Sequence, residues 1–432
     1  MALLTKILAS FCFLTTLMIF PVKLSFARSL FVSTSGNDTV SLDANSFDEP
    51  WHTPSHAWLN ARAGDTVYFR GGTYLVTSPI NTISGRNGTA NQPIVFKSFQ
   101  DEPVVFSGAP GVSPLLNLNR SYHHVEGIKF VGQGGIIVWV GEQSTATNFH
   151  AKNCEFFLKS TENISNMSAV RLQSKRASYA YITDCKFSSI STSSYKGVQV
   201  FRANGFVIKN CEFESLNSGI HIKHSNSLED TGILIANNFF HDCARGLDSV
   251  GNYMLVENNL FVGCGMEFGG DGGMGDGYVG CDYNIISHNT FYDGHFHMIY
   301  ETREEDPNKG CLWNTIKNNI FSKTCKWHQY LHIPRPHIDS DYNLYPPGDI
   351  VIENRIAYTL RTWRAHNRSD VHSIFGLPLY RGGTAKRSPL HYALKPSSPG
   401  YRAGSDGKDL GADMNIVGIS RDHAPRPVGV AN

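Results

Sequence analysis

Short runs of alternating apolar and polar residues recur along most of this chain. In residues 219–223 and 232–235 an apolar side chain stands at every second position, which is the period of a β-strand with one buried face. Glycine, asparagine, aspartate and serine fill the gaps between such runs. The pattern predicts many short strands joined by tight turns, without long helices.

A four-residue phrase repeats through this region and ends in phenylalanine. Its spacing averages about 27 residues, so each unit is too short to bury a core alone, and a stack of about ten coils is expected. Two positions before the phenylalanine, cysteine gives way to asparagine along the chain. We predict that these residues form one interior row in which amides bond between coils. The row is Cys154, Cys185, Cys211, Asn238, Asn259, Asn289 and Asn319.

The two ends of the repeat region have a different pattern. Helical segments are predicted near residues 55–62 and 359–366, where they would shield the apolar ends of the stack. No segment is rich enough in proline, glycine or serine to act as a linker. We therefore expect one domain over residues 28–432, with an N-terminal cap at 28–65 and a C-terminal extension at 326–432.

The N-terminus has the layout of a secretory signal peptide. Lys6 precedes an apolar run over residues 7–20, and the small residues Ser25 and Ala27 follow it. Such a run is short for a membrane span. We expect a signal peptide over residues 1–27 and a secreted or periplasmic protein without a membrane anchor; an uncleaved anchor is the alternative.

Composition narrows the classes of partner. The chain is 41% hydrophobic and 17% charged, with 38 basic and 37 acidic residues. The high hydrophobic fraction and low charge argue against intrinsic disorder. The near-equal numbers of basic and acidic residues give no reason to expect a nucleic acid or an anionic membrane as partner. A monomer whose charged groups act locally is expected.

The repeat resembles the right-handed parallel β-helix proteins of the pectate-lyase-like superfamily. Residues 30–33 and 63–74 resemble the opening coils of that family, and residues 397–400 and 409–412 resemble its closing segment. The resemblance implies an all-β, single-stranded right-handed parallel β-helix. It leaves the reaction open, because the architecture hosts lyases, hydrolases, epimerases, esterases and non-catalytic adhesins.

Two cysteine pairs occupy equivalent positions on successive coils. Cys243 pairs in register with Cys264, and Cys281 with Cys311. Coils stack about 4.8 Å apart, which is within the Cα separation of a disulfide. Each pair is therefore expected either to form a disulfide or to stay as buried free thiols.

A polar stripe is predicted on the outer face of one sheet. Alignment of the strands that follow the repeated turn sends Arg171, Gln199, His221, Asp248 and Glu267 outward in one row. The next row holds Gln173, Phe201, Lys223 and Glu301. The residues expected to contact substrate are Arg171, Arg202, Arg245, His297, Glu301 and Arg303.

This stripe suits β-elimination on a uronic-acid polysaccharide. The reaction needs a base and a cation that neutralises the substrate carboxylate. Lys223 is the predicted base, with His221 as its substitute. Calcium is the expected cofactor, because the glycine-rich segment 269–277 brings Asp271 near Asp248 and Glu267, and carboxylates are hard oxygen ligands.

One branch of the family has a similar local motif. Residues 223–225 resemble the Lys-Ser pair of the alginate and chondroitin lyases. That branch places an arginine on the next strand, where this chain has Ser249. The resemblance implies that Arg245 or Arg303 takes the role of that arginine.

Three other functions fit the same pattern. Asp248 and Glu267 stand on adjacent coils and could be the paired carboxylates of a glycoside hydrolase, although polygalacturonase-type motifs are absent. A C5-epimerase shares the chemistry of the lyase. A non-catalytic carbohydrate-binding surface protein is the third alternative.

Overall fold

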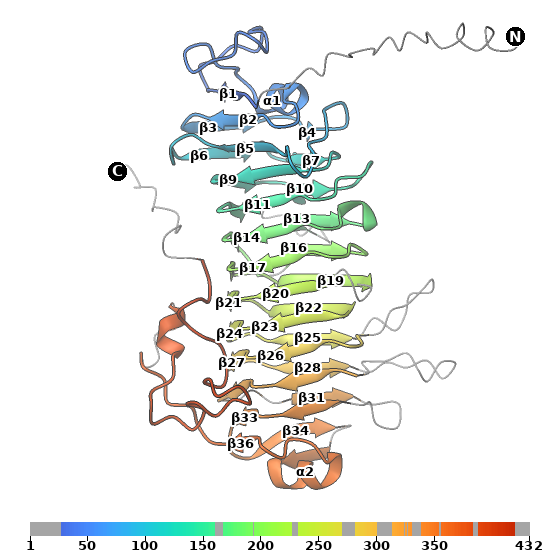
Figure 1. Cartoon of the computed structure of the whole chain (residues 1–432), viewed down its shortest axis with the longest axis vertical. Helices are drawn as coiled ribbons and strands as arrows, with labels where there is room; N and C mark the ends of the chain where they lie inside the picture. Colours follow the sequence, from blue (N-terminus) through green and yellow to red (C-terminus); the bar gives the residue numbers. More distant parts are fainter. Residues whose placement is uncertain are drawn as a thin grey trace, which may run out of the picture.

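The computed structural model describes residues 27–159, 167–192, 194–226, 232–269, 281–299, 313–323, 325, 327–330, 338–353, 356–382 and 388–419. Within these ranges the chain winds into a solenoid of three sheets that run along the stack (Figure 1). Each sheet contains 12 strands from the described part of the chain. The predicted right-handed parallel β-helix is confirmed.

In each repeat, the strand of sheet A comes directly before the repeated phrase. Its strands, in spatial order, are β1 (Ser29–Val32), β2 (Thr66–Phe69), β5 (Ile94–Ser98), β8 (His123–Glu126), β11 (His150–Lys152), β14 (Tyr181–Thr183), β17 (Val207–Lys209), β20 (Ile233–Ala236), β23 (Met254–Glu257), β26 (Ile285–Ser287), β29 (Thr315–Lys317) and β32 (Asp339–Asp341).

Sheet B carries the repeated phenylalanines. Its strands are β3 (Gly72–Val76), β6 (Val104–Gly108), β9 (Ile128–Gly132), β12 (Glu155–Leu158), β15 (Lys186–Ser189), β18 (Glu212–Glu214), β21 (Phe239–His241), β24 (Leu260–Val262), β27 (Thr290–Tyr292), β30 (Ile320–Ser322), β33 (Leu344–Tyr345) and β36 (Ile374–Phe375).

Sheet C carries the predicted polar stripe. Its strands are β4 (Ile80–Asn81), β7 (Leu116–Leu118), β10 (Ile136–Val140), β13 (Ser168–Gln173), β16 (Lys196–Phe201), β19 (Ser218–Asn226), β22 (Arg245–Asn252), β25 (Met266–Gly269), β28 (Phe296–Ile299), β31 (Trp327–Tyr330), β34 (Asp349–Glu353) and β35 (Ile356–Thr359). All pairings in it are parallel except that of β34 with β35.

The repeated phrase forms the turn from sheet A to sheet B. Its first residue adopts the left-handed conformation, with φ of 52° at Asn153 and 55° at Asn258. Asparagine and aspartate tolerate this conformation better than most residues. The following residue points into the core, where all seven members of the predicted interior row are buried. The prediction of one interior row is confirmed.

The phenylalanines stack into a continuous ladder. From Phe130 to Tyr345 successive ring centroids are 4.7–5.2 Å apart, with nearly parallel planes. Beside them the asparagines form a hydrogen-bonded ladder, since each main-chain N–H of Asn238, Asn259 and Asn289 donates to the next Asn Oδ1 at 2.9–3.0 Å. Repetition of the sequence therefore becomes repetition of contacts.

Short helices lie near the two ends of the stack, as predicted. Helix α1 (Pro54–Asn60) begins after Thr53, whose hydroxyl accepts from the His56 N–H, and it buries Trp58 against Phe96 at 4.0 Å. Helix α2 (Leu360–Asn367) begins with a capping box and buries Trp363. Both supply apolar surface where a further coil would otherwise stack.

The C-terminal segment runs back along the stack (Figure 1). It places Tyr392, Met414 and Val417 against Phe239 and neighbouring residues of sheet B. The segment lies on a different sheet from the polar stripe. Its described residues therefore cover apolar side chains of sheet B.

The described cysteines are all free and buried. The disulfide alternative for Cys243 and Cys264 is therefore wrong, and the thiols pack as small apolar groups. Burial raises the pKa of Cys243 to about 12, so it stays protonated at neutral pH. Cys281 is also free, and its expected partner Cys311 lies outside the described residues.

No helix in the described part of the chain is long and apolar enough to cross a membrane.

Candidate active site on the outer face of sheet C

One outward row crosses the central coils of sheet C. Strand register places its residues side by side on successive coils, as the alternation of apolar and polar residues predicts. Row members are Trp139, Arg171, Gln199, His221, Asp248, Glu267 and His297.

The position of His297 corrects one detail of the sequence alignment. The predicted row that holds both Lys223 and Glu301 implies that Met298 lies beside Met266, but the register sets Phe296 there, with both Phe296 and Met266 fully buried. Phe296 and Met298 are two residues apart and both apolar, so alternation alone fits either. As a result, His297 lies beside Glu267.

Arg171 is held on the upper part of the row by two neighbours. Its Nε and Nη2 donate to Gln199 Oε1 at 3.1 and 2.7 Å, and its guanidinium lies 5.1 Å from the Trp139 ring centroid. Burial lowers the pKa of Arg171, yet an arginine remains charged at neutral pH. The result is an oriented cation on a flat aromatic surface.

His221 and Asp248 form a hydrogen-bonded pair in the middle of the row. His221 Nδ1 lies 2.8 Å from Asp248 Oδ2, and His221 is only 8% exposed. When the ring is neutral and Nδ1–H donates to the carboxylate, Nε2 has the free lone pair. The pair can therefore accept or return a proton at a fixed position.

Lys223 follows His221 on a strand with a local irregularity. In β19 three steps from Ile222 to Ser225 match only two steps in β22, from Ser249 to Gly251. Such a bulge redirects side chains and is common beside active sites. Lys223 is half-buried and lies beside Phe201 of β16.

A second lysine reaches the same face from the start of β16. The pKa of Lys196 is lowered by burial first, and then by the positive charges of Arg171 and Lys223. Asp248 acts in the opposite direction. These interactions show that the three cations share one electrostatic environment around the centre of the row.

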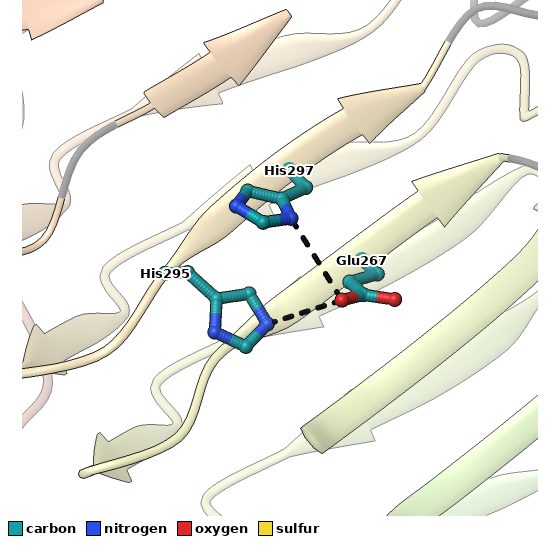
Figure 2. Close-up of side chains that lie close together, drawn as sticks. All are labelled: Glu267, His295 and His297. Carbon is teal, nitrogen blue, oxygen red and sulfur yellow. Dashed lines mark ion pairs between the residues drawn. The ribbon is translucent and has the colours of Figure 1, made fainter. Parts of the chain in front are cut away.

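Glu267 is surrounded by nitrogen atoms. Arg245 Nε donates to its Oε2 at 2.5 Å, while His295 Nε2 and His297 Nδ1 lie 3.5 and 3.7 Å from Oε1 (Figure 2). Burial raises the pKa of Glu267, but the two histidines and Arg245 lower it more, to well below its ordinary range. Glu267 is therefore a carboxylate over the whole physiological pH range.

Two glycines allow this cluster to form. A Cβ added to Gly265 would lie 1.8 Å from the His295 carbonyl oxygen, and one added to Gly294 would lie 1.8 Å from that of Cys264. The turns before β25 and β28 can thus pack backbone to backbone only because neither glycine has a side chain. This close approach brings His295 against Glu267.

The remaining predicted site residues lie at different places in the structure. Arg202 is exposed at the turn after β16, with its guanidinium 5.3 Å from the Phe201 ring centroid. Arg245 is bound to Glu267, and Ser249 is buried and faces inward. Three predicted site residues lie outside the described residues. They are Asp271, Glu301 and Arg303.

Trp139 and Lys196 were not predicted from the sequence, and His295, which was expected beside the stripe, was given no role. Trp139 sits in the apolar run 136–140, which gives no sign that one face is solvated. Lys196 precedes the alternating pattern of its strand. His295 stands in a turn, and only its spacing of two residues from His297 could have suggested that both rings converge on one group.

Comparison with known proteins agrees with the fold. A family model described as "Right handed beta helix region" matches residues 168–330. A pectate lyase PEL9 of Emericella nidulans is 33% identical over 119 residues, which cover 26% of this chain and 27% of that relative. The crystal structure of pectate lyase Pel9A superposes with a TM-score of 0.55 at 14% identity, covering 90% of this chain and 97% of the other.

The fold is that of a right-handed parallel β-helix. A mannuronic acid specific family 6 lyase from human gut microbiota shares the fold of this β-helix protein, with a TM-score of 0.51 and 15% identity over 83% of this chain and 89% of the other. The curated relative is matched over about a quarter of its length. The shared features are therefore the coil architecture and a local stretch of sequence.

Proposed function

We propose that this β-helix protein is a polysaccharide lyase that cleaves a uronic-acid polysaccharide by β-elimination. The fold is shared with polysaccharide lyases, and the matched stretch of sequence belongs to a pectate lyase. The observation that carries the proposal is the grouping of Arg171, Lys196 and Lys223 on one sheet face, where burial, and then the charges of Arg171 and Lys223, lower the pKa of Lys196. Such a face suits a polyanionic chain.

Lys223 is the proposed base. In its neutral amine form Lys223 removes the proton from the carbon beside the sugar carboxylate and becomes an ammonium group, and the electron pair left on that carbon forms the C4=C5 double bond. The bond from C4 to the glycosidic oxygen breaks, and the departing oxygen takes a proton from water or from His221 in its imidazolium form. Arg171 and Lys196 stabilise the charge that builds up on the substrate carboxylate.

Calcium remains part of the proposal as a test. Asp248 lies beside Glu267 in register, but its Oδ2 is bonded to His221 and the oxygens of Glu267 face nitrogen groups. Calcium prefers six to eight oxygen ligands, so the described residues alone fit it poorly. Asp271 would have to supply much of such a site, and a chelator arm in the assay tests its contribution.

A retaining hydrolase is less compatible with the pair Asp248 and Glu267. That mechanism needs one carboxyl group that stays protonated to act as general acid. Glu267 is held as a carboxylate by two histidines and Arg245, so Asp248 would have to be the acid, yet its Oδ2 is bonded to His221 Nδ1. The same pair therefore serves better as an anchor for cations than as an acid and a nucleophile.

The experiment follows two products on a panel of polymers. The secreted protein is incubated with polygalacturonate, alginate and a neutral polysaccharide, with calcium or with a chelator. We expect ultraviolet absorbance from unsaturated uronates on an acidic polymer. New reducing ends without that absorbance would instead indicate a hydrolase, and binding without either product would indicate a carbohydrate-binding protein.

The Lys223→Ala variant tests the proposed base. Loss of a general base should reduce turnover by about 10²–10⁴-fold, whereas loss of an outward side chain should leave the melting temperature almost unchanged. Lys209→Ala on sheet A, at the same level of the stack, is the matched control and should keep full activity. Full activity in Lys223→Ala together with none in a Glu267 variant would refute the lyase assignment.

Location and partner complete the proposal. A lyase of this kind would act on an acidic polysaccharide outside the cytoplasm, in agreement with the signal peptide predicted for residues 1–27. Size-exclusion chromatography of the secreted protein checks the predicted monomer, and N-terminal sequencing of the mature protein checks the cleavage site.

A further inference from the structure

We propose that Glu267, His295 and His297 form a binding site for a divalent transition-metal ion of the zinc class. The three side chains each offer one ligand atom, and these atoms lie within 4.8 Å of one another. Figure 2 shows both imidazole nitrogens directed at the same carboxylate oxygen. The site does not depend on the lyase proposal.

The distances match shared coordination better than direct hydrogen bonds. His295 Nε2 and His297 Nδ1 lie 3.5 and 3.7 Å from Glu267 Oε1, whereas a strong N–H···O bond to a carboxylate measures about 2.7–2.9 Å. Two ligands about 2.05 Å from a zinc ion at a tetrahedral angle are roughly 3.3 Å apart. Each histidine nitrogen is therefore about as far from the carboxylate oxygen as two ligands of one ion are from each other.

His295 supplies an independent indication. Its Nε2 is buried and makes no hydrogen bond to any described residue, with Glu267 Oε1 3.5 Å away. A buried polar nitrogen that makes no hydrogen bond lowers stability, so a group that coordinates it would remove this cost. A metal ion at the centre of the cluster is such a group.

The identity of the donors selects the class of ion. Two imidazoles and one carboxylate suit zinc and related transition metals, whereas calcium and magnesium prefer oxygen ligands. Arg245 engages Oε2 and leaves Oε1 toward the histidines. It thus orients the carboxylate as a supporting partner does around a metal.

A second cluster in the molecule provides a contrast. Glu212, Glu214 and His241 also lie close enough to share an ion. There, however, Lys186 Nζ contacts both carboxylates at 2.9 Å, and His241 is 3.0 Å from Asp242 Oδ2. These charges and hydrogen bonds satisfy the second cluster without a metal.

The test measures binding of the metal alone to the full secreted protein. Chelator-treated protein is titrated with zinc chloride and, separately, calcium chloride by calorimetry, and cobalt(II) absorption reports the ligand field. We expect one zinc ion per chain, tighter than calcium, and a cobalt spectrum typical of four-coordinate sites. Calcium binding tighter than zinc, or no zinc binding, would overturn the proposal.

Three variants locate the site. His295→Ala and His297→Ala should weaken zinc binding by more than about 100-fold, beyond the 10–100-fold typical of outer partners, and His241→Ala should leave it unchanged. Circular dichroism checks folding, and His295→Gln replaces any alanine variant that fails to fold. Wild-type zinc affinity in folded His295 and His297 variants, or its loss in His241→Ala, would refute the assignment.

Discussion

Asn259→Leu tests the interior ladder directly. The Asn259 side chain accepts bonds from the main-chain N–H and the Nδ2 of Asn238, at 2.9 and 3.0 Å. Its own Nδ2 donates to the carbonyls of Ile235 and Glu257. Leucine has a similar volume but no polar atoms, so the change removes hydrogen bonds while leaving little empty space.

The expected cost comes mainly from one orphaned donor. Asn238 Nδ2 keeps its bond to Ile208 O at 3.0 Å, and Asn289 Oδ1 still accepts from the Asn259 N–H. The buried main-chain N–H of Asn238 loses its acceptor, which costs about 1–3 kcal/mol. With an unfolding entropy of about 2.1 cal/mol/K per residue, the melting temperature of a chain this long should fall by about 1–4 °C.

The assay compares two positions of the same row. Differential scanning calorimetry of Asn259→Leu is set against Cys154→Ala, whose thiol makes only long contacts of 3.6 and 3.3 Å to carbonyl oxygens. The alanine variant should cost about 1 kcal/mol from lost packing. An unchanged melting temperature in Asn259→Leu would show that the amide ladder contributes nothing, and would refute the reasoning.

Three further predictions concern charge and packing. Burial raises the pKa of Glu212, but His241 and Lys186 lower it more, to about 2. The ionised Glu212 therefore stabilises the fold at pH values above its ordinary pKa of about 4.3, and this stabilisation is lost as the pH falls toward 2. Glu212→Gln should lose less stability than wild type between pH 5 and pH 3 in urea titrations; an equal loss would contradict this. Asp248→Asn should lower turnover about tenfold or more by loosening His221, and unchanged pH–rate profiles would count against the pair. Removing residues 388–432 should lower the melting temperature, because the contacts of Tyr392 and its neighbours with sheet B are lost. Each buried apolar side chain contributes about 1.5–3 kcal/mol. An unchanged melting temperature would show that the segment does not stabilise the solenoid.

The coil architecture could be predicted because its determinants repeat. The phrase that ends in phenylalanine marks the turn and the interior row. It also shows which residues of each strand point inward, so the outward row from Arg171 to Glu267 follows from the alternation of side chains. The helices at both ends were also predictable from their patterns. What sequence could not supply is the contact between residues in different turns.

The candidate site shows where counting fails. Trp139 lies in an entirely apolar run, so its outward orientation has no local signal. The sequence does not fix the register of His297, because Phe296 and Met298 satisfy alternation equally well. The convergence of His295 on Glu267 depends on the backbone approach at Gly265 and Gly294, which is a property of the stack and not of either turn alone.

The phenylalanine and asparagine ladders make the spacing of outward groups discrete. Because every interior contact repeats from one coil to the next, groups on sheet C can be separated along the axis only by multiples of about 4.8 Å. Lys223 and Glu267 lie on β19 and β25, two steps apart. Deleting or duplicating a whole coil between them would change that interval by one step while every remaining ring and amide keeps an equivalent neighbour. The distance between a base on one coil and an ion site on another is therefore set by the number of coils between them.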